Sequence, residues 1–390
     1  LGDSAETHCP FSLNRIGNSC ALHAGAACDK IDTVIMDLKA GQYRSMARNE
    51  KRRVKLTDIA ARTGFTVGTI SKALQNKSGI APETRRSIIQ AAKEIGYIAN
   101  TQAGALRSGS SKTVAIIVSD IANPLFAIEI KFCVEALERS GYRAFVMGTE
   151  ERPEREVQAV VSALSKNVDG VLLCPTQKSL EAVELLQQNG MPFVLMGRRF
   201  DEGLDADYVV CDDENGGYLA GKHLAELGHR RVLVITADPH ISSSRERLSG
   251  FTRAMTERGV SVDPSLIRLS DPSAHDSAAL IDELLRDRTD FSAIFAFSDY
   301  IAWELIYALN LRGIRVPEDI SIVGFDDVQS HMCFPPPLTT VHFPKRTIST
   351  TSVSLLLERI AHSGGERQKI VLDSYLVVRD TTRPLAHTAE

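Results

Sequence analysis

Short apolar runs alternate with amphipathic stretches along most of the chain, from residue 112 onward. Short apolar runs bounded by turn residues are typical of buried strands, and apolar positions at three- to four-residue spacing are typical of helices. Strands are predicted at 114–119, 143–147, 170–174, 193–196, 232–236, 267–269, 293–297 and 321–324, and helices at 124–140, 154–166, 179–189, 216–227, 245–258, 277–286 and 301–311. Such units require doubly wound parallel sheets with helices on both faces. The expected fold class is α/β, and because about 270 residues exceed one comfortable core, two lobes are expected.

A different pattern occupies residues 55–97, where three short helical segments follow one another. Thr57 opens the first. Thr66 opens the second, over Val67–Leu74, and Pro82 stands in the first turn of a third that runs to Ile95. Apolar residues at helical spacing can close a small core: Ile59, Ile70, Leu74, Ile88, Ala92 and Ile95. The pattern predicts a helix-turn-helix domain over residues 46–98.

Charge is distributed unevenly along the chain. The 390 residues carry a net charge of -4. Residues 46–112 contain 13 Lys or Arg against 4 Asp or Glu, a net +9, so the remainder carries -13. A small basic segment joined to an acidic body is typical of a nucleic-acid-binding head on a domain with another task.

The composition excludes several classes of protein. With 43% hydrophobic and 24% charged residues the chain is an ordinary folded protein, and no apolar run approaches the ~18 residues of a membrane span. No secretory signal opens the sequence, so a cytoplasmic location is expected. Its seven cysteines are too few and too scattered for a disulfide framework.

Residues 1–45 show no sustained helical or alternating pattern. Cys9, Cys20, His23 and Cys28 lack the paired spacing of a zinc site, so no metal is expected. Because Met46 stands just before the basic segment, we expect residues 1–45 to be an unstructured extension or an artefact of start-site choice, dispensable for DNA affinity and stability.

The segment VKLTDIAARTGFTVGTISKAL, residues 54–74, resembles the DNA-binding head of the lactose/galactose repressor (LacI/GalR) family of bacterial transcription regulators. The resemblance continues through Thr84-Arg85 and Ile95-Gly96-Tyr97 to Leu106. In a recognition helix, some residues face the core of the domain, and the residues between them point outward and can contact base edges. The resemblance assigns bases to Val67, Gly68 and Lys72, and phosphates to Thr69 and Ser71. Lys72 suits guanine O6 and N7, and Val67 suits a thymine methyl.

Residues 99–111 are similar to the hinge of that family, which becomes a short helix in the minor groove at the operator centre. The resemblance includes Asn100 in the hinge and matches Leu106 with a leucine that wedges between the central base pairs, and Arg107 follows with a charge suited to the backbone or groove. Ala99 stands where the family usually has proline, which loosens the expected stop between the third helix and the hinge.

Residues 112–390 resemble the two-lobed, periplasmic-binding-protein-like receptor core of the same family. The motifs in family order are Asn123–Phe126, Asn215–Arg231, Arg247–Phe251, Gly324–Asp327 and Pro336–Val341. The resemblance implies three crossings between lobes, near residues 211, 343 and 373, with a small-molecule effector in the cleft. Ligands of open parallel sheets bind beyond the carboxyl ends of strands, which points to the loops after Val118, Met196, Thr236 and Phe297.

The resemblance implies that the effector contacts Leu125, Phe126, Arg198, Ser243, Arg247, Asp299 and Phe343. Leu125 and Phe126 would form an apolar wall, while Arg247 and Asp299 would hold the ligand. A carboxylate and a guanidinium over an apolar wall suit a neutral polyhydroxylated ligand, such as a sugar. Spacing alone favours an exposed or structural ion pair between Arg247 and Asp299, and it is the resemblance that shifts the expectation to ligand contact.

The sequence therefore predicts a homodimeric transcription regulator, with a repressor favoured, that binds a pseudo-palindromic DNA operator and is controlled by a small molecule. The alternative is a free small-molecule receptor or transport component with the same core. No cofactor is expected. The chain lacks a Gly-x-x-x-x-Gly-Lys-Ser/Thr loop and a Gly-x-Ser-x-Gly elbow, so an enzyme is not expected. It also lacks the leucine heptads of a tetramerising tail, which favours a dimer.

Overall fold

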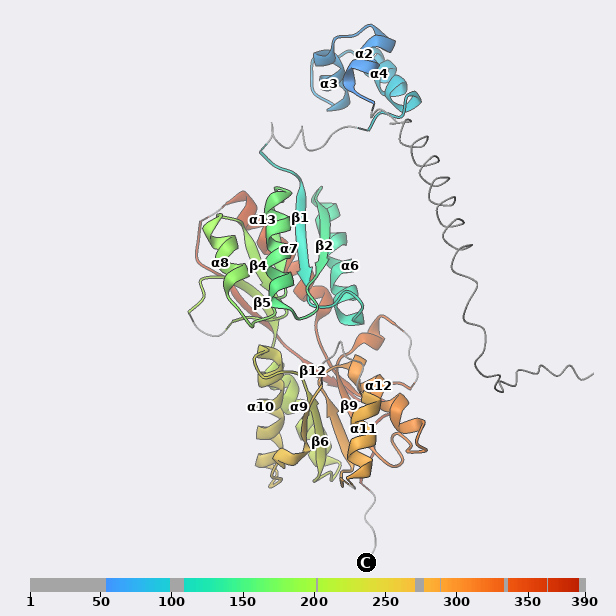
Figure 1. Ribbon diagram of the computed structural model, residues 1–390, viewed down its shortest axis with the longest axis vertical. Helices are drawn as coiled ribbons and strands as arrows, with labels where there is room; N and C mark the ends of the chain where they lie inside the picture. Colours follow the sequence, from blue (N-terminus) through green and yellow to red (C-terminus); the bar gives the residue numbers. More distant parts are fainter. Residues whose placement is uncertain are drawn as a thin grey trace, which may run out of the picture. The chain divides into compact units, whose positions relative to one another are not determined.

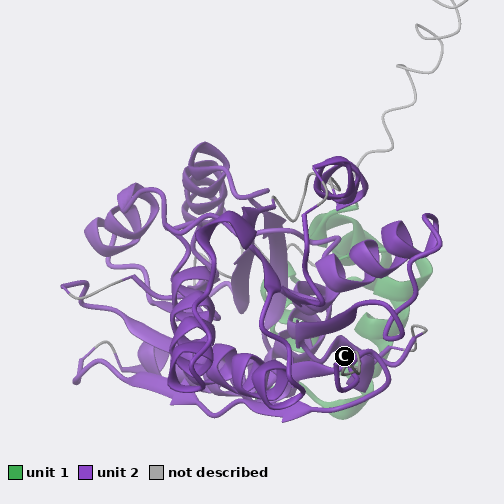
Figure 2. Cartoon of the chain, turned by 90° about the horizontal axis from the view of Figure 1, so that it is seen from below, with its two compact units in different colours: residues 1–100 green, residues 101–390 purple. Residues whose placement is uncertain are grey.

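The computed structural model describes residues 54–98, 109–200, 203–270, 277–287, 289–332, 336–362 and 364–385 (Figure 1). The chain divides into two compact units at residue 100, and Figure 2 colours them separately. Each unit is considered by itself below.

The described part of the first unit is a three-helix bundle made of α2 (Leu56–Thr63), α3 (Val67–Leu74) and α4 (Pro82–Glu94). Helix α2 starts where the Lys55 amide donates to the Asp58 carboxylate at 2.7 Å, and it ends at Gly64 in the left-handed conformation. The buried core consists of Ile59, Ile70, Ala73, Ile88 and Ala92. The helix-turn-helix prediction is confirmed; Leu74 and Ile95 are only partly buried beside this core.

The described residues of the second unit form two six-stranded sheets, one in each lobe (Figure 1). The first lobe has the strand order β11-β5-β4-β3-β1-β2, entirely parallel. Its strands are β1 (Thr113–Val118), β2 (Arg143–Gly148), β3 (Gly170–Leu173), β4 (Phe193–Met196), β5 (Asp207–Cys211) and β11 (Lys369–Leu372). One face packs against α6 (Pro124–Arg139) and α13 (Lys345–Ala361), the other against α7 (Pro153–Ser165) and α8 (Glu181–Gln188).

The second lobe has the strand order β12-β10-β9-β8-β6-β7, in which only β12 is antiparallel. Its strands are β6 (Val232–Thr236), β7 (Ile267–Leu269), β8 (Ala293–Ala296), β9 (Ser321–Asp326), β10 (Thr340–His342) and β12 (Tyr375–Val377). Helices α9 (Asp213–Glu226) and α10 (Ser242–Glu257) cover one face, and α11 (Ser277–Arg286) and α12 (Asp299–Asn310) the other. Two short 3-10 helices are η1 (Pro264–Leu266) and η2 (Val328–Ser330).

The chain passes between the lobes at three connections: β5 to α9, β10 to α13, and β11 to β12. All eight strands predicted from the sequence are present within two residues of their expected bounds, and the α/β prediction is confirmed. Strands β5, β10, β11 and β12 and helix α13 were not predicted. Among the described residues, no helix combines the length and apolar character needed to cross a bilayer.

Candidate functional site

Helix α3 is held at both ends by hydrogen bonds. The Thr66 hydroxyl accepts a hydrogen bond from the Thr69 amide at 3.2 Å, which caps the first turn. At the other end, the Arg85 guanidinium of α4 donates to the Ala73 carbonyl at 3.1 Å and to the Asn76 side-chain oxygen at 2.7 Å. These contacts fix the orientation of a helix of only eight residues.

The outer face of α3 carries the residues predicted to contact DNA. Because Ile70 and Ala73 are buried in the core, the opposite face is open to solvent. Val67, Gly68 and Lys72 are exposed, and Thr69 and Ser71 are half-buried. The helix contains no acidic residue, as suits a surface that meets a polyanion. The predicted hinge residues Asn100, Leu106 and Arg107 lie outside the described residues.

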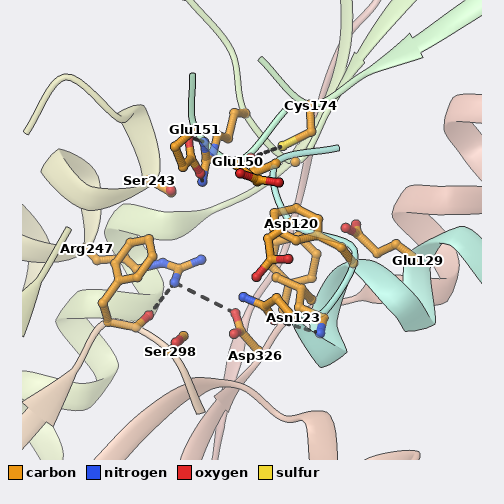
Figure 3. A pocket seen from close by; sticks show the side chains of 17 residues that line it. Asp120, Asn123, Glu129, Glu150, Glu151, Cys174, Ser243, Arg247, Ser298 and Asp326 are labelled. Carbon is orange, nitrogen blue, oxygen red and sulfur yellow. Dashed lines mark hydrogen bonds and ion pairs between the residues drawn. The ribbon is translucent and has the colours of Figure 1, made fainter. Parts of the chain in front are cut away.

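A cavity of about 650 Å³, including its open mouth, lies between the two lobes (Figure 3). Its wall is formed where strands of both sheets end, as expected for parallel sheets. Six of the seven predicted effector residues line it: Leu125, Phe126, Arg198, Ser243, Arg247 and Phe343. The apolar side chains come from the start of α6 and from the β10–α13 connection, and the polar ones from both lobes.

Arg247 is held in the wall by several partners. Its guanidinium donates to the Asp213 carboxylate at 2.7 Å and to the Phe297 carbonyl at 2.6 Å. It also lies 3.5 Å from the centroid of the Phe325 ring. A further nitrogen-to-oxygen distance of 3.8 Å separates it from Asp326, drawn as a dashed line in Figure 3. Arg247 is 4% exposed, so these partners preorganise it toward the cavity.

Arg198 enters the wall from the loop after β4, but it is already paired. It donates twice to the Glu151 carboxylate, at 2.9 and 2.7 Å. This pair holds the pKa of Glu151 below its usual range, against the opposing effect of burial, and raises the pKa of Arg198. Both residues of the pair line the cavity, so a ligand would meet a neutralised ion pair rather than a lone guanidinium.

Asp299 is the one predicted effector residue that does not line the cavity. Its carboxylate is fully buried and accepts hydrogen bonds from the Val328 amide at 2.8 Å and from the Thr340 hydroxyl at 2.5 Å. The side chain thus ties the start of α12 to η2 and β10. The spacing-based alternative of an Arg247–Asp299 ion pair is not observed either, because Arg247 pairs with Asp213.

The structure adds acidic residues that the sequence analysis did not assign to the site. Glu129 of α6 and Asp326 at the end of β9 line the cavity, each 1% exposed. Burial and the neighbouring Asp326 raise the pKa of Glu129 to about 8. Asp326 lies within the Gly324–Asp327 motif, which could have signalled it, whereas Glu129 lies inside an ordinary amphipathic helix and gave no signal.

Polar contacts link the two lobes. The Ser242 amide donates to the Gln177 side-chain oxygen at 3.0 Å, and Arg199 forms an ion pair with Glu246 at 2.8 Å. Gln177 and Arg199 belong to the first lobe, and Ser242 and Glu246 to α10 of the second. These contacts form only when the lobes are close together, so they depend on lobe closure.

The cysteine in the cavity wall is not an activated nucleophile. Burial raises the pKa of the Cys174 thiol to about 12, so the reactive thiolate is not formed. Within the described residues no group of three or more His, Cys, Asp or Glu side chains could hold a metal ion.

Two family models match the chain. Residues 111–379 match the periplasmic binding proteins and sugar binding domain of the LacI family, and residues 55–100 match the bacterial regulatory proteins of the lacI family. The HTH-type transcriptional regulator DegA of Bacillus subtilis (strain 168) is 33% identical over 335 residues, 84% of this chain and 98% of DegA. The HTH-type transcriptional repressor PurR of Haemophilus influenzae (strain PittEE) is 31% identical over 85% of this chain and 99% of its own.

Solved structures are similar over both units. A lac repressor dimer bound to operator and the anti-inducer ONPF has a TM-score of 0.72 at 25% identity, covering 85% of this chain and 100% of its own. A complex of the transcriptional regulator CelR with cellobiose has a TM-score of 0.63 at 30% identity, covering 84% and 100%. All four of these relatives are transcription regulators and none is an enzyme.

Proposed function

The chain belongs to the LacI family of bacterial transcription regulators, and from that membership we propose that it is a repressor whose binding to a pseudo-palindromic operator is controlled by a sugar or related polyol. It is a DNA-binding regulator with an effector-binding core, not an enzyme. Since its target is bacterial DNA, we place its action in the cytoplasm.

The proposal depends above all on one observation: the chain combines a recognition helix with an open outer face and a receptor body with a buried polar cavity. A free receptor or transport component would account for the cavity but not for the helix-turn-helix unit. On α3, Val67, Gly68 and Lys72 would read bases, while Thr69 and Ser71 would contact phosphates. Asn100, Leu106 and Arg107 would serve in the hinge.

We further propose that two copies bind one operator. The lac repressor of similar fold was solved as a dimer on its operator. In this chain, large apolar side chains stand exposed on the second lobe, including Tyr307 of α12 at 68% and Leu311, which caps the end of that helix, at 66%. A second copy would cover them. A two-fold dimer predicts a two-fold symmetric DNA site.

Control by the effector would act through lobe closure. A ligand that touches Leu125 and Phe126 of one lobe and Ser243 and Arg247 of the other stabilises the arrangement in which Arg199 reaches Glu246. Because linkage is reciprocal, operator DNA must change effector affinity by the same factor, typically about 5–150-fold.

The test starts from selection of DNA sequences by the full chain, followed by operator titration with and without a panel of sugars and polyols. We expect a symmetric site, two chains per site, and an affinity that one class of carbohydrate changes. Arg247→Ala should abolish that change while leaving DNA binding without effector intact. Full-affinity binding of a single chain to a half-site would contradict the dimer, and a wild-type response in Arg247→Ala would remove this residue from the site.

A further inference from the structure

Two buried carboxylate oxygens in the cavity wall have no hydrogen-bond partner within the described part of the chain. They are Oε1 of Glu129 and Oδ1 of Asp326. Both residues are 1% exposed and both line the cavity. A buried polar atom without a partner is strongly unfavourable, so such atoms in a ligand cavity mark positions where a ligand donates hydrogen bonds.

The two oxygens come from opposite lobes. Glu129 lies on α6 of the first lobe and Asp326 at the carboxyl end of β9 of the second. Figure 3 shows Asp326 near Asn123 and joined to Arg247 by a dashed line, which marks the 3.8 Å ion pair. A single donor-rich group that engages both Glu129 and Asp326 would therefore join the lobes.

The cations near these carboxylates already have other partners. Arg198 is paired with Glu151, and Arg247 donates to Asp213 while lying 3.8 Å from Oδ1 of Asp326, which is ion-pair distance but too long for a hydrogen bond. The Lys345 ammonium donates to the carbonyl oxygens of Asp326 at 2.5 Å, Asp327 at 2.9 Å and Phe343 at 3.2 Å. Donation to carbonyls satisfies its N–H groups without bonding either unpartnered carboxylate oxygen.

Carboxyl groups outnumber guanidinium groups among the described residues that line the cavity. The lining contains two guanidinium groups, from Arg198 and Arg247, against five carboxyl groups, from Asp120, Glu129, Glu150, Glu151 and Asp326. A phosphate or carboxylate on the ligand has no N–H group to offer Glu129 and Asp326, whereas an ammonium supplies up to three N–H donors and a positive charge that favours the ionised form of both groups.

We propose that the effector is an amine-bearing sugar or polyol whose ammonium group donates to Glu129 and Asp326, while its hydroxyl groups meet the rest of the wall. This inference rests on the proposed function, since it names the class of carbohydrate that the same cavity would take. It revises the expectation of a neutral ligand, which assumed an unpaired guanidinium facing Asp299.

The electrostatic surroundings support this assignment. Glu129 faces Asp326 of β9, Lys345 of α13 and Arg198, and burial with Asp326 raises its pKa to about 8. Burial raises the pKa of Asp326 to about 7, although Arg247 of α10 and Lys345 oppose this change; Asp213 of α9 reinforces it. Near neutral pH the two carboxyl groups therefore hold protons that a bound ammonium would displace.

The experiment uses the full chain and matched sets of ligands in isothermal titration calorimetry. One set is glucose, 6-amino-6-deoxyglucose and glucose 6-phosphate; the others are the equivalent galactose and ribose derivatives, and sorbitol with 1-amino-1-deoxysorbitol. In one set we expect the amine derivative to bind at least about tenfold more tightly than the parent sugar or polyol, which corresponds to about 1.4 kcal/mol. Where the set contains a phosphate, the phosphate should bind weakest. Between pH 6 and 8.5 the amine should bind more tightly as pH rises, while the hydroxyl partner should not.

Glu129→Gln and Asp326→Asn should each bring the amine-to-hydroxyl preference close to one. Glu138→Gln is the matched control, because it makes the same change on an exposed position of α6 and should leave the preference unchanged. If Asp326→Asn fails to fold, Glu129→Gln alone still tests whether the preference for the amine depends on these carboxyl groups.

A hydroxyl or phosphate member that binds most tightly, or a preference that survives Glu129→Gln, would overturn the inference and leave a carbohydrate-controlled repressor intact. Failure of every member of every set to bind would instead overturn the carbohydrate effector of the proposed function as well.

Discussion

The crossing of α9 and α10 depends on glycine. A Cβ atom added to Gly250 of α10 would lie 2.8 Å from the carbonyl carbon of Glu214 and from the amide nitrogen of Tyr218, and closer still to the Glu214 carbonyl oxygen. On the facing helix, a Cβ at Gly217 would lie 2.7 Å from the Arg247 carbonyl carbon. These neighbours are backbone atoms, which cannot move aside by changing rotamer. We therefore expect Gly250→Ala to force the two helices apart.

The size of the effect follows from these distances. Carbon atoms reach favourable contact at about 3.5 Å, so a methyl at 2.8 Å from the Glu214 carbonyl carbon requires a separation of about 0.7 Å or more. A gap of about 0.5–1 Å forfeits a quarter to a half of the dispersion energy of the separated atoms. Overpacking costs about 1–3 kcal/mol, and the better helix propensity of alanine returns about 0.5–1 kcal/mol. The net destabilisation spans about 0–2.5 kcal/mol, and the contact with backbone atoms favours the upper part of that range.

The same change should weaken the effector response, because Arg247 lies one turn before Gly250 and its 2.7 Å bond to Asp213 spans the two helices. Urea unfolding followed by circular dichroism gives the stability, and operator titration with effector gives the response. Gly364→Ala is the control, since its added Cβ would meet no atom within 4 Å. A Gly250→Ala protein as stable as the control would refute the close-packing argument.

Three further changes test other parts of the molecule. Arg359 donates to the buried Asp207 carboxylate at 2.8 and 2.9 Å, so Arg359→Ala should cost about 3–5 kcal/mol in urea unfolding. Arg315→Ala, which removes an exposed ion pair with Asp319, should lower the free energy of unfolding by only about 0–1 kcal/mol. Equal losses in the two variants would contradict the argument that burial makes the Arg359 pair more important. Because the pKa of Glu129 is raised to about 8, the folded state keeps a proton that the unfolded state loses above about pH 4.3, so stability should fall from pH 5 to 8. Glu129→Gln should remove part of this decrease in stability. If the wild type and Glu129→Gln lost stability in parallel as the pH rises, titration of Glu129 would not be the cause. Lys72→Ala should reduce discrimination at one symmetric operator position by about 1–3 kcal/mol in fluorescence anisotropy; a uniform loss over all sequences would assign this lysine to the phosphates instead.

Local signals were sufficient for the DNA-binding head and for the regular parts of the body. Thr66 and Pro82 mark helix starts through hydrogen bonding and a fixed φ, and these effects act within one turn of the chain. Central parallel strands such as β4 and β8 are buried on both faces, so each reads as a continuous apolar run. The sequence alone therefore determined the helix-turn-helix unit and the doubly wound fold class.

Elements without such a local signal were set by tertiary contacts. Helix α13 contains many serine and threonine residues, which are modest helix formers, yet it is largely buried against the first sheet. The Ser349, Thr350 and Ser354 hydroxyls donate to carbonyls one turn earlier and so need no partner from another element, whereas the buried Ser352 hydroxyl has no hydrogen-bond partner among the described residues. Strands β11 and β12 are short and partly exposed, and they form because the third connection between lobes pairs with existing sheet edges.

The effector site depended most on tertiary structure. The sequence supplied Asp299 and Arg198 as candidates, but the fold directs Asp299 toward Thr340 and pairs Arg198 with Glu151. It brings Glu129 and Asp326, nearly two hundred residues apart, to one cavity wall. A charged side chain is available to a ligand only if no residue distant in the sequence already pairs with it. Such pairing is determined by the packing of the two lobes.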